Sequence, residues 1–168
     1  MTNPVEEART RFIQSWAEMG PKWGIGKTMA QIHALLMISE KPISTDDVMK
    51  ELAISRGNAN MSLRSLADWG LIRRVFIKGE RKEYFQSEKD VWNMFCRIAR
   101  ERKKREIEPV IETMQECLNL IGKDKTSALF RQRLDELLDV LKTLDYILGK
   151  IAQQERNSVI PKILKLLA

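Results

Sequence analysis

The order of elements between Thr28 and Gln86 is the feature that most constrains the fold. Three segments with apolar residues at helical spacing come first, and two strand-like runs follow them on either side of a Lys-Gly-Glu-Arg turn. The helices are expected at 28–39, 44–52 and 55–69, and the strands at 71–77 and 82–86. Three helices followed by a hairpin are the layout of a winged helix-turn-helix domain, in which the hairpin is the wing.

The rest of the chain is predicted to be helical. An amphipathic helix is expected over 5–19, with Gly20-Pro21 ending it. Beyond Glu88 the apolar spacing continues, and Pro109 is expected to kink or divide the helix there. The predicted fold class is mainly α with a small β-hairpin wing. Its expected parts are an N-terminal packing or dimerisation helix at 1–24, a winged helix-turn-helix domain at 25–88, and a helical linker and dimerisation region at 89–168.

The last third of the chain carries two apolar patterns that need a surface to pack against. One is a seam at 3-4-3-4-3 spacing, formed by Leu134, Leu137, Leu141, Leu144, Leu148 and Ile151. This spacing fits either a coiled coil or an ordinary helix of a bundle. The other pattern is the tail 157–168, whose large apolar side chains are expected in a groove within one subunit or between two.

The net charge of +6 is concentrated in the middle of the chain. Residues 1–40 hold four basic and four acidic side chains, and residues 106–168 hold nine basic and ten acidic side chains. By contrast, 41–82 hold nine basic and five acidic side chains, and 97–105 hold six and one. The segment 97–105 alone is also typical of a solvated helix face. Its closeness to the basic winged helix favours a polyanionic partner, namely double-stranded DNA.

The helix predicted over 55–69 has the two faces of a recognition helix, with Ala59, Leu63 and Leu66 as its apolar stripe. Ser55, at its start, can cap the helix and bind a phosphate. Gly57 leaves room for the protein backbone to approach the DNA backbone closely. Arginine suits guanine and asparagine suits adenine in the major groove. The candidate DNA-binding residues are Ser55, Arg56, Gly57, Asn58, Asn60, Met61 and Arg64 on the helix, and Lys78, Arg81 and Lys82 on the wing.

The same stretch resembles a known group of regulators. The sequence RGNANMSLRSLADWGLIRRVFIKGERKEYF, followed by DVWNMF and ARERKKREIEP, is similar to the GbsR-type group of the MarR superfamily of winged helix-turn-helix transcriptional regulators. The Ser-Arg-Gly-Asn opening, the Asp-Trp-Gly-Leu helix end and the Gly-Glu-Arg-Lys wing carry the resemblance, which covers roughly Trp23 to Pro109. One departure is Ala59-Asn60, where the group has a larger apolar residue followed by serine. That departure bears on base preference.

The resemblance implies a homodimer with one winged helix per subunit, which represses or activates transcription at pseudo-palindromic operators. It puts Arg56, Asn58, Asn60, Met61 and Arg64 on the DNA side of the recognition helix, and Arg81 on the wing. The predicted function is therefore that of a sequence-specific DNA-binding transcriptional regulator, and repression is predicted over activation. The alternative is a winged-helix interaction module that binds a partner chain through its C-terminal helices.

Control by a small effector also follows from the resemblance. Members of the group are associated with choline-related control, and an organic cation is bound between aromatic rings. The aromatic side chains that can form such a pocket, or else pack in the core, are Trp23, Trp69, Trp92 and Phe95. Arg97 and Arg100 lie close to Cys96 in sequence, so a redox role for Cys96 or Cys117 also stays open.

Other classes of function find little support in the composition. Two cysteines and the single histidine, His33, build neither a four-ligand zinc site nor a disulfide framework. His33 is expected to be a hydrogen-bonded packing residue, and no second histidine or arranged nucleophile supports catalysis. We therefore expect no enzyme activity, no cofactor and no metal. No apolar run approaches the ~20 residues of a membrane helix, and the N-terminus lacks a signal-peptide core, which indicates a soluble cytoplasmic protein.

Overall fold

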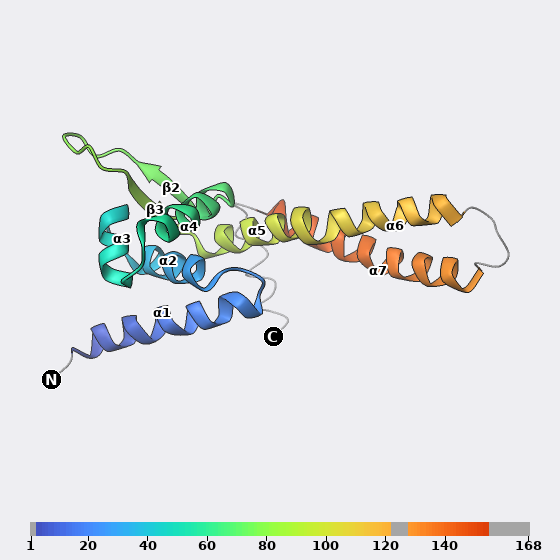
Figure 1. The fold of residues 1–168 in the computed structure, drawn as a ribbon, viewed down its shortest axis with the longest axis horizontal. Coiled ribbons are helices and arrows are strands. Elements are labelled where there is room, and N and C mark those ends of the chain that lie inside the picture. Colours follow the sequence, from blue (N-terminus) through green and yellow to red (C-terminus); the bar gives the residue numbers. More distant parts are fainter. Residues whose placement is uncertain (1–2, 122–127, 155–168) are drawn as a thin grey trace. The chain divides into compact units, whose positions relative to one another are not determined.

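The computed structural model describes residues 3–121 and 128–154, so the expectation for the tail 157–168 lies outside the described residues. The chain forms two compact units, the first ending at Val91 and the second beginning at Trp92. In the described ranges the strands all belong to the first unit, and the second is helical (Figure 1). The predicted fold class, mainly α with a small β wing, is confirmed.

The first unit has the predicted order of three helices and a hairpin, preceded by one more helix. Its helices are α1 (Pro4–Lys22), α2 (Lys27–Ile38), α3 (Thr45–Leu52) and α4 (Arg56–Asp68). Its strands are β1 (Ile43–Ser44), β2 (Ile72–Val75) and β3 (Tyr84–Ser87), in the antiparallel order β1-β3-β2. Phe85 of β3 lies opposite Ile43 on one side and Arg74 on the other. The sequence did not reveal β1, because two residues show no alternation.

Local capping explains where α3 and α4 begin and end. The Ser44 hydroxyl and the Asp47 carboxylate form a reciprocal capping box at the start of α3. The Ser55 hydroxyl accepts a hydrogen bond from the Asn58 N–H at the start of α4. After α4, Gly70 adopts φ +68° and its N–H bonds to the Ala67 carbonyl. This left-handed ending is the usual position of glycine after a helix, and it turns the chain into β2.

The core of the first unit fixes which face of α4 points outward. Ile32, Leu35 and Leu36 of α2 are at most 1% exposed, and they pack in the same core as the inner side of α4. The predicted stripe of α4, formed by Ala59, Leu63 and Leu66, is also at most 1% exposed. Since opposite faces of a helix cannot both be buried by one core, the polar side of α4 is left on the surface.

Helix α1 ends later than expected. It runs through Pro21 to Lys22, because a proline in the last turn sacrifices only one hydrogen bond and the Trp23 N–H still reaches the Met19 carbonyl. Gly20 lies against α2 so closely that a Cβ atom there would stand 2.7 Å from the Ala30 Cβ. The helix is ended by Gly24, which adopts φ +76° while the Ile25 N–H bonds back to the Gly20 carbonyl, so Gly24 rather than Gly20-Pro21 stops α1.

The second unit contains α5 (Val91–Arg102), the π-helical turn η1 (Lys103–Ile107), α6 (Glu108–Ile121) and α7 (Ala128–Ala152). Only Val91, the first residue of α5, is assigned to the first unit. The predicted division near Pro109 occurs at η1, where the Glu108 N–H bonds to the Lys103 carbonyl. Pro109 then lies in the first turn of α6, where its missing N–H is tolerated. Lys103 links this turn to α7 through an ion pair of 2.9 Å with Asp145.

The predicted leucine seam of α7 does not act as one seam. Leu134 and Leu138 are buried, whereas Leu137 and Leu144 are 50% and 43% exposed. With about 100° between successive residues, Leu137 and Leu144 belong to a second stripe that also contains Val140 and Ile147. The two stripes lie roughly a quarter turn apart. Helix α7 therefore packs against α6 along one stripe and exposes the other.

Candidate nucleic-acid interface

The outward face of α4 is a continuous stripe of exposed side chains. Gly57, Met61, Arg64 and Asp68 are exposed at spacings of four, three and four, and Asn60 beside them is half-buried. Met61 contributes a large apolar side chain to this face and is 67% exposed. The stripe is narrow enough to enter a major groove, and its acidic end at Asp68 limits how far along α4 phosphates can approach.

Three predicted DNA-binding cations carry no internal partner in the described part of the chain. Arg64, Lys78 and Arg81 are exposed and form no ion pair or side-chain hydrogen bond within residues 3–121 and 128–154. Arg64 comes from the middle of α4, and the other two come from the hairpin between β2 and β3. Their donors are therefore available to phosphates or to base edges.

The hairpin turn sets the places of the wing cations. The Glu80 N–H bonds to the Ile77 carbonyl at 3.0 Å, and Gly79 adopts φ +90° between them. Residues with side chains rarely adopt that conformation, so glycine is required at this position. Lys78 is the second residue of this turn and Arg81 follows it directly, and both are exposed to solvent.

Two residues at the start of α4 behave differently from each other. A Cβ atom at Gly57 would meet nothing within 4 Å, so the packing of the protein itself does not require glycine there. Asn58, by contrast, turns toward α2, where its Nδ2 donates to the Thr28 Oγ1 at 3.1 Å. The side chain predicted to read a base at Asn58 is thus engaged in holding α4 against α2.

Asp46 joins the recognition helix to the wing. Its Oδ1 lies 2.7 Å from the Arg56 Nη2, and its Oδ2 lies 3.3 Å from the Lys82 Nζ. The hydrogen bonds from Arg56 and then Lys82 lower the pKa of the Asp46 carboxyl, and the bond to Asp46 raises the pKa of Lys82. Two of the predicted DNA-binding cations therefore share one carboxylate. The sequence analysis did not identify this link, because it joins Asp46 to residues ten and thirty-six positions onward.

The aromatic candidates for an effector pocket divide between the two units. Trp23 follows α1 and is 51% exposed, and Trp69 caps the end of α4. In the second unit the rings of Trp92 and Phe95 stack with centroids 5.7 Å apart, and the Trp92 Nε1 donates to the Gln154 carbonyl. Cys96 is buried and Cys117 is half-buried, and neither forms a disulfide. A ligand pocket and a redox role both stay predictions.

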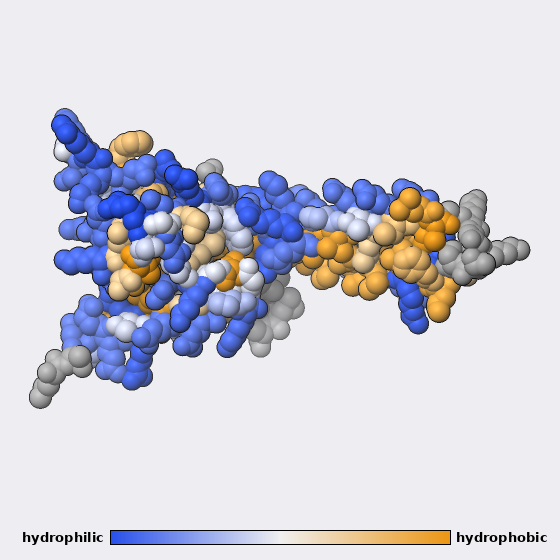
Figure 2. Space-filling model, viewed as in Figure 1, coloured by the Kyte–Doolittle hydropathy of each residue, from blue (hydrophilic) through white to orange (hydrophobic). Residues whose placement is uncertain are grey.

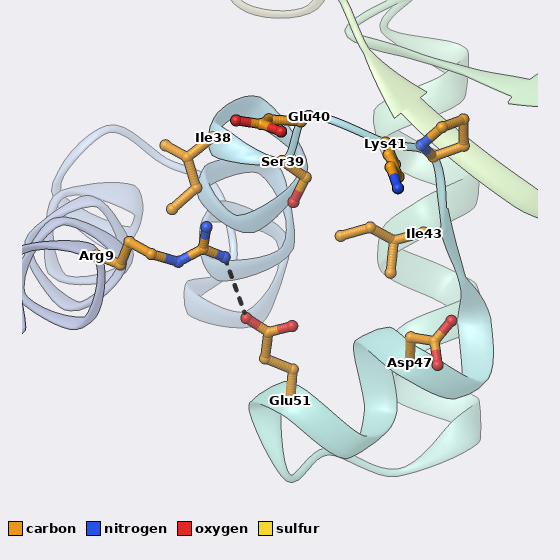
Figure 3. A pocket seen from close by; sticks show the side chains of 9 residues that line it. Arg9, Ile38, Ser39, Glu40, Lys41, Ile43, Asp47 and Glu51 are labelled. Atoms are coloured by element: carbon orange, nitrogen blue, oxygen red, sulfur yellow. Dashed lines mark ion pairs between the residues drawn. The ribbon is translucent and has the colours of Figure 1, made fainter. Parts of the chain in front are cut away.

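A hollow of about 420 Å³ opens in the first unit (Figure 3). Arg9 of α1 reaches across to Glu51 of α3 at 3.6 Å, and the loop after α2 closes the other side. Its nine lining residues include no aromatic side chain. The hollow thus lacks the ring walls that hold an organic cation.

The described ranges offer little to other kinds of site. No group of three or more His, Cys, Asp and Glu side chains there is arranged to bind a metal ion. None of the helices described combines the length and apolar character that crossing a bilayer demands. His33 lies at 2% exposure with its ring against Trp16, and its Nε2 has no hydrogen-bond partner among the described residues, contrary to expectation.

Comparison with known proteins points to the same region. The model of the MarR family matches residues 25–83, which contain α2, α3, α4 and most of the wing. The "HTH-type transcriptional repressor GbsR" of Bacillus subtilis (strain 168) is 24% identical over 132 residues, covering 79% of this chain and 71% of that protein. The "Putative HTH-type transcriptional regulator YvaV" of the same organism is 21% identical over 169 residues, covering 94% and 95%.

A solved structure shares the fold. It is titled "Crystal Structure of a transcriptional regulator", and it superposes with a TM-score of 0.71 at 20% sequence identity. The match covers 88% of this chain and 97% of that one. At that identity the likeness concerns the fold alone, and it extends over the helices of both units as well as the winged helix.

Proposed function

We propose that the chain, whose residues 25–83 match the model of the MarR family, is a sequence-specific DNA-binding transcriptional regulator that acts in the cytoplasm as a homodimer. The observation that carries the proposal is the exposed face of α4, with Arg64 at its centre and uncommitted cations on the adjoining wing. A helix of this shape fits the major groove, and flanking cations meet phosphates. The similarity to proteins named as transcriptional regulators, covered over 71% and 95% of their length, supports this function over an enzymatic one.

Repression is the sign of regulation that we propose. GbsR, one of the relatives, is called a repressor, and a dimer lying across a promoter blocks polymerase without any further contact. Transcription in vitro from a promoter that contains the selected binding site tests this point. Transcripts should decrease as protein is added, and an increase would reverse the sign while leaving DNA binding intact.

The proposed homodimer uses the exposed apolar stripe of the second unit. Leu137, Val140, Leu144 and Ile147 follow one another at 3-4-3 spacing on α7, and each is 43–58% exposed. Apolar side chains gather over the α6–α7 hairpin (Figure 2). A contiguous apolar stripe in water favours association, and a second copy related by a two-fold axis offers the same stripe. Two recognition helices would then read the two halves of a pseudo-palindromic operator.

A partner chain of another kind is the alternative occupant of this stripe. The two cases differ in the mass of the pure protein in solution. Sedimentation equilibrium should show a mass twice that of the chain if the stripe joins two copies. A monomer that forms a stable complex with a different protein would favour the interaction module instead.

The proposal is tested by selecting bound fragments from the source genome and measuring their affinity as salt is varied. Specific complexes should weaken steeply, because each phosphate contact releases counterions and the slope of log K against log salt is about −0.9 per contact. An absence of binding at low salt to any genomic fragment, the protein's own promoter included, would contradict the function.

Substitution of Arg64 by alanine should reduce the preference for the selected site. Because Arg64 stands at the centre of the exposed face of α4, loss of a base contact is expected to cost about 1–3 kcal/mol on the operator and much less on random DNA. Titration of both duplexes by fluorescence anisotropy measures the difference. Arg11→Ala removes the same charge from exposed α1 and serves as the control. Equal weakening on both duplexes would reassign Arg64 to a phosphate.

A further inference from the structure

Asp46 stands out because it is an acid among residues that face DNA in the proposed function. It lies in the first turn of α3 and holds Arg56, the first residue of α4, and Lys82, which lies in the wing loop two residues before β3. The three side chains are 41%, 64% and 54% exposed, so all of them can meet a macromolecule from solution. The capping of α3 does not account for Asp46, because Ser44 and Asp47 form the capping box.

The cluster of Asp46, Arg56 and Lys82 also contributes little to the stability of the fold. Ion pairs between exposed side chains contribute little to folding, since water screens the attraction and ordering long side chains has an entropic cost. What the cluster does alter is the charge seen from outside. Two cations that share one carboxylate present a net charge of about +1 instead of +2 to a polyanion at a distance. Distant attraction of any DNA sequence is reduced accordingly.

The contacts leave both cations able to bind a phosphate without leaving Asp46. Arg56 uses its Nη2 for the hydrogen bond to Asp46, and a guanidinium has five N–H donors. The ammonium of Lys82 likewise has three. Holding one edge of each cation fixes the direction of the remaining donors. A phosphate that matches this direction binds preorganised donors, whereas a phosphate placed elsewhere meets the repulsion of the carboxylate.

We propose that Asp46 is a specificity-determining residue, which orients Arg56 and Lys82 for one arrangement of DNA phosphates and weakens binding to all other arrangements. The inference rests on the proposed DNA-binding function. It assigns a role to a residue that reads no base. Discrimination then comes from two sources, the base contacts of the α4 face and the phosphate geometry that Asp46 imposes on the first turn of α4 and the wing.

The test compares Asp46→Asn with the wild-type protein on two duplexes of equal length, a genomic fragment selected by the wild type and a random sequence. At about 0.1 M salt, where charges act over about 10 Å, the variant should bind the random duplex roughly three- to tenfold more tightly. Its affinity for the selected fragment should change by less than about twofold, because the lost orientation offsets the lost repulsion. The ratio of the two affinities therefore falls.

Two further variants separate charge from position. Glu51→Gln removes the same charge from the same helix, but Glu51 pairs with Arg9 of α1, so both affinities should stay as in the wild type. Asp46→Glu keeps the charge and moves the carboxylate, so binding to the random duplex should not change while binding to the selected fragment weakens. Circular dichroism melts confirm that each variant is folded.

The outcomes distinguish this inference from the function on which it rests. If the wild type binds neither duplex at low salt, the proposed function itself fails. If the wild type binds but Asp46→Asn changes both affinities by the same factor, Asp46 is a simple counter-charge and the specificity role is overturned. An unchanged affinity ratio with unchanged affinities overturns it as well.

Discussion

Replacing Val140 by aspartate is expected to convert the protein to a monomer and to abolish specific DNA binding. Val140 lies in the middle of the exposed stripe of α7 and is 58% exposed within one copy. A carboxylate there would have to be buried without a partner if two stripes packed together. A monomer presents one recognition helix, so affinity for the operator should fall by about a thousandfold or more, toward the level of non-specific binding.

Sedimentation and anisotropy measure these two effects on the same preparation. Gln132→Asp introduces the same charge on the polar side of α7, and it should leave both the mass and the affinity unchanged. Since Val140 is exposed and does not contribute to the core of one copy, the helix content of Val140→Asp should match that of the wild type. A Val140→Asp protein that remains dimeric would show that the two copies meet elsewhere.

The second large effect concerns stability below neutral pH, which depends on His33. Burial lowers the pKa of His33 from 6.5 to about 4, because desolvation penalises the charged imidazolium. Between pH 6.5 and about pH 4, His33 is therefore protonated in the unfolded chain but neutral in the folded chain. Stability is complete above pH 6.5 and falls as the pH approaches 4, and the total loss is about 3 kcal/mol.

Urea unfolding between pH 7 and pH 4 measures this loss, with His33→Leu as the comparison. The variant has no titrating group at the site, and it also removes the buried Nε2 that lacks a partner among the described residues. It should therefore keep its stability over the same range. The pKa of the Asp46 carboxyl is lowered from 3.8, so its own contribution disappears only at more acid pH. Equal pH dependence in both proteins would show that His33 is not the responsible group.

The parts of the site that local sequence predicts are those that depend on neighbouring residues only. Ser55 caps α4 through the N–H three positions onward, and Gly70 ends it in a left-handed turn. Gly79 bends the wing in the same manner, and the apolar spacing of α4 decides which side is buried. Each of these features involves residues only a few positions apart. Capping and turn formation depend on local backbone geometry, so they can be predicted without knowing the rest of the fold.

The parts that the sequence did not reveal are relations between elements far apart in the chain. The bond from Asn58 to Thr28 spans 30 positions, and it removes a predicted base-reading side chain from the exposed face of α4. The shared carboxylate of Asp46 depends on how α3, α4 and the wing come together. In α7, the spacing of the leucines allowed one seam, but packing against α6 divided it into a buried and an exposed stripe.

By itself, then, the sequence determined the winged helix-turn-helix order, the helix caps, the turn of the wing and the basic character of this region. The reason is that capping, turn conformation and hydrophobic periodicity each depend on a few neighbouring residues, so they can be predicted from the sequence. Only the tertiary structure decided which polar side chains of α4 remain available and which cations are held by an acid. Hydrogen bonds and ion pairs act over a few ångströms, so they exist only after packing of the apolar core has brought distant residues together.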